Sequence, residues 1–291
     1  MILIVGASGG LGGKIVDRLL ERGERLRLVT RAGSRPTHAD HRDVEHVAAD
    51  LTDPESLLRA CHGVDTVVTT ANAAGRRPPD TVQTVDHAGN DNLIHAAEAT
   101  DVKRFLFVSA LGAHPDHPMP LLAAKGATEQ RLRESRLDWT ILRPATFMDL
   151  LIPLVVAGPA LSNRPVTLIG SGQRKHSFVA SADVAAYAVA ALTHPETPNQ
   201  TIVVGGPTPL TWHDIVTAFE VELARNVPVE HIPVGEAVPG VPELVTHLLT
   251  ALDGYDSQID MTATRDRYGV HPTPISEFVR DLLRAEATSA A

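Results

Sequence analysis

The chain begins with MILIVGASGGLGGKIVDRLL, residues Met1–Leu20. Met1–Val5 is a continuously apolar run, which is typical of a strand buried on both faces of a parallel sheet. A glycine-rich turn follows directly, and Ile15–Leu20 is the apolar start of a helix. A strand, a glycine-rich turn and a helix in this order predict a dinucleotide-binding site.

Three glycines have separate tasks in such a turn. Gly6 allows the tight turn, Gly9 lets the backbone approach a pyrophosphate, and Gly12 lets the helix pack on the strand. A second register, with Gly10 in place of Gly9, fits the spacing as well. The unpaired amides of the helix then hold the phosphates. The loop residues expected to contact a cofactor are Gly6, Ser8, Gly9, Gly10, Leu11 and Gly12.

The first half of the chain alternates strands and helices. We expect further strands at Arg25–Thr30, His46–Ala49, Thr66–Thr70, Arg104–Ser109 and Trp139–Leu142, and helices at Lys14–Arg22, Pro54–Cys61, Val82–Ala99 and Leu121–Ser135. This alternation predicts an α/β fold, a Rossmann-like doubly wound parallel sheet. Residues 1–150 would form an NADP-binding domain, and residues 151–291 a smaller C-terminal substrate lobe that partly completes the sheet.

The second half has a looser pattern in which proline is frequent. Short strands are expected at Val166–Ile169, His176–Val179, Thr201–Val204 and Val229–Ile232. Helices are expected at Ala182–Leu192, Trp212–Arg225, Pro242–Leu252 and Ile275–Ala285.

Composition narrows the class of protein. The 291 residues carry a net charge of −9, which argues against a nucleic-acid partner. The single cysteine, Cys61, cannot form an internal disulfide, and no apolar run reaches membrane-spanning length, so we expect a cytoplasmic protein without a membrane partner. No H-E-x-x-H or paired-cysteine motif predicts a metal site. The oligomeric state stays open.

The end of the second strand indicates which dinucleotide binds. NAD sites place an acidic residue there, whereas NADP sites place a cation against the additional phosphate. The strand ends in LVTR, with Arg31 at this point and Arg35 just beyond it. The sequence therefore predicts NADP(H).

Several longer stretches resemble one known family. VGASGGLGG, AADLTDPESL, VKRFLFVSALGA, AAKGATEQRLRESRLDWTILRPATFM and SFVASADVAAYAVAAL, in this order, make the chain similar to the NmrA-like atypical short-chain dehydrogenase/reductases, which are relatives of isoflavone-reductase-like and quinone-reductase-like enzymes. The resemblance implies that Lys125 holds the nicotinamide ribose and that Ser109 lies beside the nicotinamide. The other cofactor contacts that it implies are Asp50, Leu51, Thr70, Ala71, Asn72, Pro144, Ala145 and Phe147.

One position departs from the ordinary dehydrogenase pattern. Ordinary short-chain dehydrogenases carry a proton-donating tyrosine four residues before the lysine, whereas here Leu121 precedes Lys125 at that spacing. Losing a positioned acid costs about a hundred- to ten-thousand-fold in rate. We therefore expect an oxidoreductase that transfers hydride from NADPH to a small conjugated carbonyl compound, a quinone or an enone, whose delocalised anion takes its proton from water. Lys125 would supply positive charge near that anion.

Alternatives remain open at this point. The chain fits a non-catalytic NADP(H)-binding redox sensor, or a non-reductive dehydratase or cyclase, and Lys125 instead fits a surface ion pair with Glu129. Ser109 would be a second catalytic group, or would only satisfy backbone groups. Substrate contacts are expected from His114, His176 and Phe147, and His117 is a further candidate for the missing acid.

Overall fold

The structure is a computed structural model that describes residues 1–291 except 32, 34–35, 74–75, 77, 195–196 and 290–291. The chain folds into two compact units. Unit 1 comprises Met1–Pro144, Val184–Val203 and Tyr268–Val270, and unit 2 comprises Ala145–Asp183, Val204–Arg267 and His271–Ala291. The division into an NADP-binding domain and a substrate lobe at residue 150 stays a prediction.

Unit 1 is built on a seven-stranded sheet with the order β3-β2-β1-β4-β5-β6-β8. The strands are β1 (Ile2–Val5), β2 (Leu26–Thr30), β3 (Val44–Ala48), β4 (Thr66–Thr69), β5 (Arg104–Val108), β6 (Asp138–Pro144) and β8 (Gln200–Val204). The strands from β3 to β6 pair in parallel. This confirms the predicted Rossmann-like doubly wound sheet. The strand order reverses between β1 and β4, and ligands of such sheets bind at this switch point.

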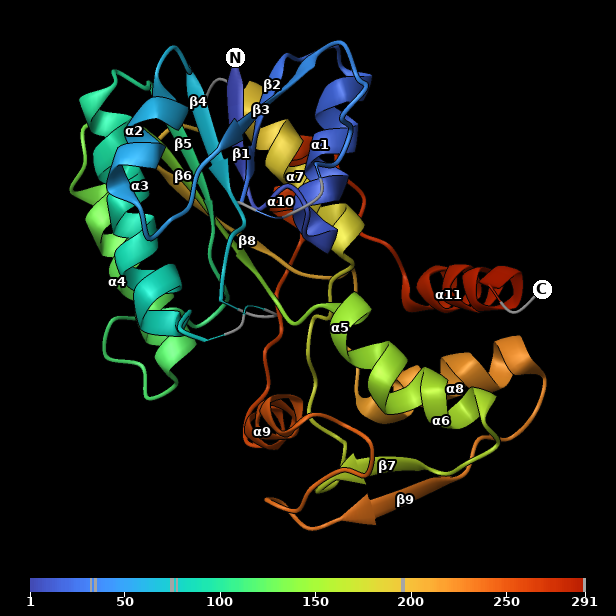
Figure 1. Ribbon diagram of the computed structural model, residues 1–291. Coiled ribbons are helices and arrows are strands. Elements are labelled where there is room, and N and C mark those ends of the chain that lie inside the picture. The colour runs from blue at the N-terminus through green and yellow to red at the C-terminus, as the bar shows by residue number, and fades with distance from the viewer. Residues whose placement is uncertain (32, 34–35, 74–75, 77, 195–196, 290–291) are drawn as a thin grey trace. The chain divides into compact units, whose positions relative to one another are not determined.

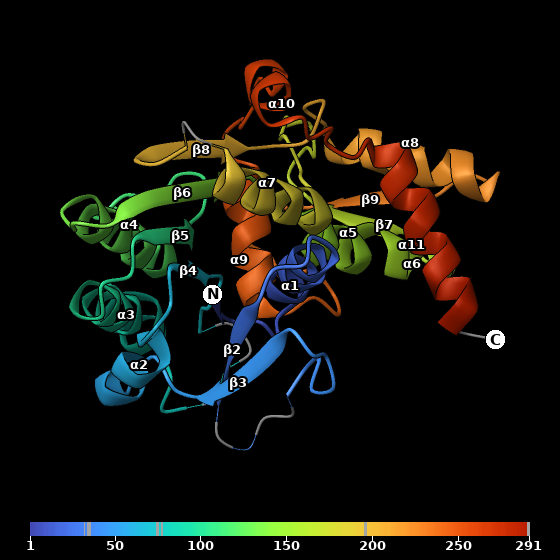
Figure 2. The same ribbon diagram turned by 90° about the horizontal axis from the view of Figure 1, so that it is seen from above.

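Helices cover both faces of this sheet (Figures 1 and 2). One face carries α2 (Pro54–Cys61), α3 (Ala88–Ala99) and α4 (Pro120–Arg133), and the other carries α1 (Gly10–Glu21) and α7 (Ser181–Thr193). The central strand is buried on both sides, with Leu3 and Ile4 fully buried. The continuously apolar run Met1–Val5 therefore predicted this buried strand correctly.

Unit 2 contains a second, two-stranded parallel sheet of β7 (Val166–Ile169) and β9 (Val229–Ile232) (Figure 1). Its helical elements are α5 (Met148–Ile152), the π-helix η2 (Pro153–Ala157), α6 (Gly158–Leu161), α8 (Trp212–Leu223), α9 (Glu243–Leu252), α10 (Thr262–Tyr268) and α11 (Ile275–Ser289). The core of this unit includes the buried aromatic residues Phe178, Trp212 and Phe219.

Some expected elements differ from the structure. His176–Val179 forms only isolated bridges at His176 and Val179 instead of a strand. The predicted helix over Val82–Ala99 starts with the π-helix η1 (Val82–His87). The helical run from Met148 to Leu161 was not expected, because prolines usually break helices, and here the π-helix η2 begins at Pro153.

Crossing a membrane requires a helix of sufficient length and hydropathy. None of the helices in the described part of the chain is both long enough and apolar enough to cross a membrane.

Cys61 is buried in α2, and burial raises the pKa of its thiol to about 12. A thiol in this state is a packing residue, not a nucleophile.

Candidate functional site

The glycine loop joins β1 to α1 in a conformation that only glycine fits at two positions. Gly6 has a φ of +95°, and a Cβ there would lie 2.6 Å from Thr70 Oγ1. A Cβ on Gly12 would lie 2.0 Å from the Gly6 carbonyl oxygen. Gly9 is the N-cap of α1 and donates its N–H to the same carbonyl at 3.0 Å. The register of Gly6, Gly9 and Gly12 is therefore the one that the structure favours.

The start of α1 has the properties of a phosphate-binding site. Its first turn carries no acidic residue, and its N-cap makes no side-chain hydrogen bond. The first amides of a helix have no partner within the helix, and the positive end of the helix dipole lies at the same place. A Cβ on Gly10 would meet nothing within 4 Å, so this end of the helix is open. The loop thus fits the pyrophosphate of a dinucleotide.

A cleft of about 530 Å³, counting space open to solvent, lies between the glycine loop and the ends of β2 and β3. Its lining includes Ser8, Arg31, Asp50, Leu51, Ala71 and Arg76. Arg31 is 45% exposed at the end of β2, as a phosphate-binding cation requires. Arg35, the second predicted cation, lies outside the described residues.

Asp50 and Leu51 form the wall of this cleft after β3. Asp50 Oδ1 accepts hydrogen bonds from the amide and hydroxyl of Thr52, at 2.9 and 2.8 Å. Burial raises the pKa of Asp50, but the bonds from Thr52 and the charges of Arg76 and Arg31 outweigh it, so the net pKa is lowered. Leu51 is almost fully buried and is an apolar part of the cleft lining. Both properties suit an adenosine, which has a flat apolar ring and polar edges.

The segment after β4 lies beside the glycine loop. Thr70 donates its amide to Val5 O at 3.0 Å and its hydroxyl to Gly6 O at 3.4 Å. Ala71 lines the cleft, and Asn72 follows it. Ala73 donates its amide to the buried carboxylate of Asp86 at 2.9 Å. This predicted cofactor segment is therefore fixed at both of its ends.

Lys125 on α4 is buried, with only 7% of its surface exposed. Its Nζ donates to Val108 O at the end of β5 at 3.0 Å and lies 5.2 Å from the centre of the Phe107 ring. Burial lowers the pKa of Lys125, while the negative charges of Asp86 and Glu129 act in the opposite direction. An ammonium group has three protons, so two remain for other acceptors.

Glu129 does not pair with Lys125 on the surface of the helix. It is fully buried, and its described ion pairs are with Arg143 at 2.6 Å and with Arg133 at 2.7 Å. Ser109 Oγ donates a hydrogen bond of 2.5 Å to Glu129 Oε1. Although burial raises the pKa of Glu129, the bonds from Arg143, Ser109 and Arg133 lower it overall. The interpretation of Lys125 as a surface partner of Glu129 is therefore wrong.

The loop after β5 carries the histidines considered as proton donors. His114 is exposed, and its Nδ1 accepts the amide of Asp116. His117 is half-buried and accepts the amide of Met119. The loop packs on α4 at Gly126, where a Cβ would lie 2.2 Å from the His114 carbonyl carbon. Gly126 therefore allows this loop to approach the helix turn that carries Lys125.

The remaining predicted contacts lie at the end of unit 1 and in unit 2. Pro144 ends β6 and accepts the amide of Leu111 at 2.9 Å. Ala145 and Phe147 begin unit 2, where Phe147 is the half-buried N-cap of α5. Their roles toward a cofactor or substrate stay predictions.

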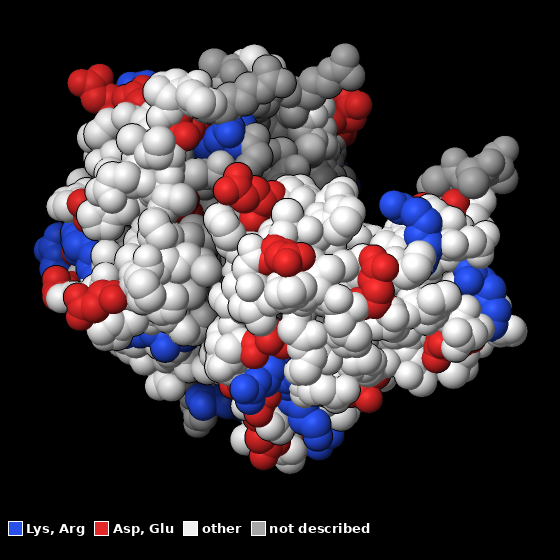
Figure 3. Space-filling model, turned by 90° about the horizontal axis from the view of Figure 1, so that it is seen from below, with Lys and Arg blue, Asp and Glu red and all other residues white. Residues whose placement is uncertain are grey.

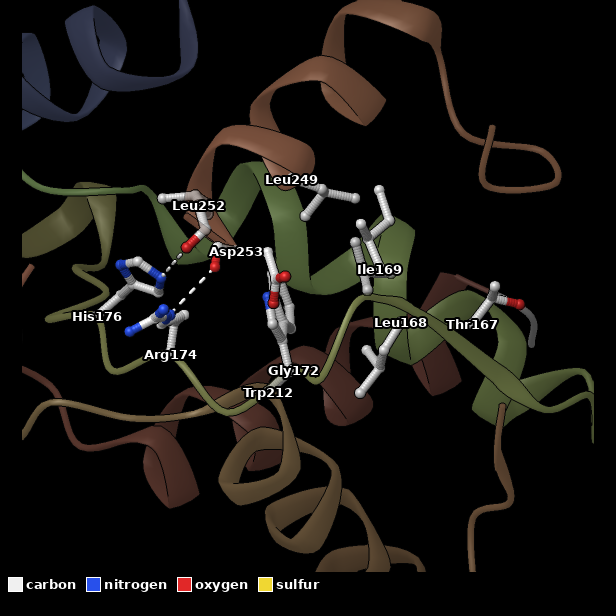
Figure 4. A pocket seen from close by; sticks show the side chains of 11 residues that line it. Thr167, Leu168, Ile169, Gly172, Arg174, His176, Trp212, Leu249, Leu252 and Asp253 are labelled. Atoms are coloured by element: carbon white, nitrogen blue, oxygen red, sulfur yellow. Dashed lines mark hydrogen bonds between the residues drawn. The ribbon is translucent and has the colours of Figure 1, made fainter. Parts of the chain in front are cut away.

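His176 lines a pocket of unit 2 (Figure 4). It is 1% exposed, its Nδ1 lies 2.7 Å from Ser257 Oγ, and its Nε2 lies 3.0 Å from Leu252 O. Burial lowers the pKa of His176. The hydrogen bond to Leu252 and the charge of Asp256 raise this pKa, but burial outweighs them. Since both ring nitrogens already have partners, this geometry favours a structural role, and its contact with a substrate stays a prediction.

Surface charge gives no sign of a basic patch on the face shown in Figure 3. Lys and Arg side chains there lie among Asp and Glu side chains. That nucleic acid is not a partner stays a prediction from the acidic composition.

Comparison with known proteins identifies the family. A family model described as NAD(P)H-binding matches residues 6–195. The NAD(P)H azoreductase of Xenophilus azovorans is 31% identical over 78% of this chain and 75% of its own length. The chain belongs to the NAD(P)H-binding family. This finding confirms the resemblance to NmrA-like atypical short-chain dehydrogenase/reductases and the prediction of a nicotinamide dinucleotide, NADP(H).

The proteins to which this chain is similar carry different names. The photosystem II assembly factor Ycf39 of Trieres chinensis is 30% identical over 80% of this chain and 72% of its own length. Among solved structures, the NADPH-dependent quinone oxidoreductase QOR2 of Escherichia coli in complex with NADPH superimposes with a TM-score of 0.82, at 21% identity over 97% of this chain and all of that one. At this identity the superposition supports the fold.

Sequence reasoning missed several polar residues of the site. Arg76 lines the cleft, and Asp86 accepts the amide of Ala73. Arg143 pairs with the buried Glu129, which was expected only as a surface partner of Lys125. Asp86, Glu129 and Arg143 are ionisable residues in helical or apolar stretches, and this signal alone does not reveal their partners.

Proposed function

We propose that this chain is an NADPH-dependent reductase of a flat conjugated acceptor, a quinone or an enone. Support comes from the match to the NAD(P)H-binding family, from the similarity to an NAD(P)H azoreductase, and from the site residues. The observation that carries the proposal is the buried ammonium of Lys125 at the carboxyl end of β5, next to the segment that follows β4. Active sites of open parallel sheets lie at this edge.

The residues divide the work of binding. The amides at the start of α1 would hold the pyrophosphate, and Arg31 the 2′-phosphate of the adenosine. Asp50 and Leu51 would flank the adenine, and Thr70, Ala71 and Asn72 the middle of the cofactor. Ser109 and Pro144 would contact the nicotinamide end, and the resemblance implies Ala145 and Phe147 as further contacts. When bound, NADPH supplies the hydride that reduces the acceptor.

Lys125 would stabilise the negative charge that develops on the acceptor, and would not be the main proton donor. Its ammonium lies in a buried setting, where a fixed charge interacts more strongly with a developing anion than it would in water. Ser109 directs its proton at Glu129, and Leu121 offers none. An acceptor that spreads the negative charge over a conjugated system needs no proton in the same step. Quinones and enones meet this condition, whereas simple ketones do not.

The test is the oxidation of NADPH with a panel of quinones, enones and simple ketones. We expect consumption with quinones or enones and little with ketones. Lys125→Ala should lower kcat by about a hundredfold or more, on the scale of one lost electrostatic group. Rapid reduction of plain ketones would contradict the argument from Leu121 and Lys125.

A second candidate is a non-catalytic NADP(H)-binding regulator. It is favoured by the relatives named photosystem II assembly factors, which match over most of this chain. Such a protein would bind NADPH tightly yet leave the nicotinamide absorbance unchanged with every acceptor of the panel.

A further inference from the structure

Arg76 is a second cation in the cleft that contains Arg31. It belongs to the segment between β4 and η1, and its side chain is only 9% exposed. Its Nη1 lies 3.6 Å from Asp50 Oδ2 and 3.0 Å from Asp80 Oδ2. A guanidinium group with so little exposure needs such partners, because a buried unpaired charge is costly.

Asp80 connects this buried cation to the exposed one. The Oδ2 atom that accepts from Arg76 also lies 3.9 Å from Arg31 Nη1. Asp80 itself is 22% exposed, so water screens the pair only in part. One carboxylate oxygen therefore lies within ion-pair distance of two guanidinium groups.

Two guanidinium groups that face one point form a site for a dianion. Planar, charge-assisted contacts to phosphate are the usual task of arginine in such places. A carboxylate at the same point supplies one negative charge of the two that a phosphate monoester brings. It also repels that phosphate, since like charges at short distance disfavour each other.

We propose that Asp80 limits the preference for NADPH over NADH by competing with the 2′-phosphate for Arg31. The proposal rests on the NADPH site described above. Without a dinucleotide, Asp80 lies within ion-pair distance of both cations, and Asp50 supplies the second negative charge at Arg76. With NADPH, the phosphate takes over Arg31, and Asp80 retains only Arg76. NADH has no phosphate at this position, so Asp80 opposes its binding little.

The test is a titration of wild type and Asp80→Asn with NADPH, NADH, adenosine 2′,5′-bisphosphate and adenosine 5′-monophosphate. Asparagine keeps the shape and removes the charge. Because the ion pairs are partly exposed, we expect the Kd for NADPH and for the bisphosphate to fall by about three- to tenfold. The Kd for NADH and for the monophosphate should change by less than about twofold, by the same reasoning.

Two controls keep the test specific. Asp101→Asn removes an equal charge from an exposed position at the end of α3, and should leave every Kd unchanged. In an Arg31→Ala background, Asp80→Asn should lose most of its effect on NADPH, because coupled residues do not act additively. Thermal unfolding of each variant shows whether it is folded.

The outcomes separate this inference from the proposed function. Weaker NADPH binding in folded Asp80→Asn, or an equal gain for NADPH and NADH, would overturn competition by Asp80. Wild type that binds neither dinucleotide would overturn the proposed function itself.

Discussion

The hydroxyl of Ser109 donates its hydrogen bond to the fully buried carboxylate of Glu129, at 2.5 Å. Its proton is therefore directed away from any acceptor molecule. Ser109→Ala should lower the free energy of unfolding by about 1.5–3 kcal/mol, the range for a hydrogen bond to a charged group.

The rate with the best acceptor should fall by less than about tenfold, far below the loss of a general acid. Steady-state kinetics and urea unfolding measure both quantities. Ser135→Ala, just beyond the end of α4, serves as the control, since Ser135 Oγ bonds only nearby backbone among the described contacts: it donates to Leu132 O and accepts the amide of Leu137. A rate loss of a hundredfold or more in Ser109→Ala would make Ser109 the proton donor.

The charge of Lys125 predicts a pH dependence. Burial lowers its pKa, and Asp86 is the first of the groups that oppose this shift. If the ammonium is needed, kcat falls as the pH rises through the lowered pKa. Asp86→Asn removes the opposing charge, so this fall should move to lower pH.

Lys125→Arg provides the contrast, because arginine stays charged at every accessible pH. The alkaline fall in kcat should be absent in this variant. An alkaline limb that Asp86→Asn leaves in place, or that Lys125→Arg retains, would show that another group titrates.

Gly12 tests the packing of the glycine loop. A Cβ there would lie 2.0 Å from Gly6 O, so Gly12→Ala should lower the free energy of unfolding by about 1–3 kcal/mol through overpacking, and weaken dinucleotide binding. Gly13 is the matched control, because its Cβ would lie 3.6 Å from Ala7 O in ordinary contact. Gly13→Ala should be neutral or stabilising in urea unfolding. Equal stability of both variants would refute the close packing of α1 on β1.

His176 links stability to pH. Burial lowers its pKa from the ordinary 6.5, so below pH 6.5 the unfolded chain takes up a proton that the native chain does not. The free energy of unfolding should therefore fall as the pH decreases from 6.5 toward the lowered pKa.

Urea unfolding of wild type and His176→Gln, at a pH of about 7.5 and of about 5.5, measures this contribution. At the higher pH the variant should have a lower free energy of unfolding than wild type. On acidification its free energy of unfolding should fall by less than that of wild type. His247→Gln, at an exposed position, should behave like wild type. A His176→Gln variant with the full acid loss would contradict the assignment.

The fold of unit 1 was predictable because its signals are local. Buried parallel strands such as β1 are continuous apolar runs, and α2 begins where Pro54 follows the cap Asp53, whose side chain accepts from Ser56. The glycine loop was predictable for the same reason, since its three glycines lie within seven residues.

The polar interior of the site was not predictable, because its partners are far apart in the chain. Glu129 accepts hydrogen bonds from Arg143 on β6 and from Ser109 at the end of β5. No periodicity in the sequence predicts contacts between residues so far apart in the chain. Asp80 is near Arg31 only because the segment after β4 approaches the end of β2. The helix through Pro153 was missed because a π-helical turn accommodates the proline.

The central claim is that the glycine loop and Arg31 bind NADPH in preference to NADH. Titration of wild type, Arg31→Ala and the control Arg22→Ala with both dinucleotides tests it most directly. Because Arg31 is half exposed, Arg31→Ala should weaken NADPH binding by about tenfold, the lower end for a charge-assisted contact, and leave NADH and the Arg22→Ala control unchanged. Equal or tighter binding of NADH by wild type, or no binding of either dinucleotide, would contradict the account.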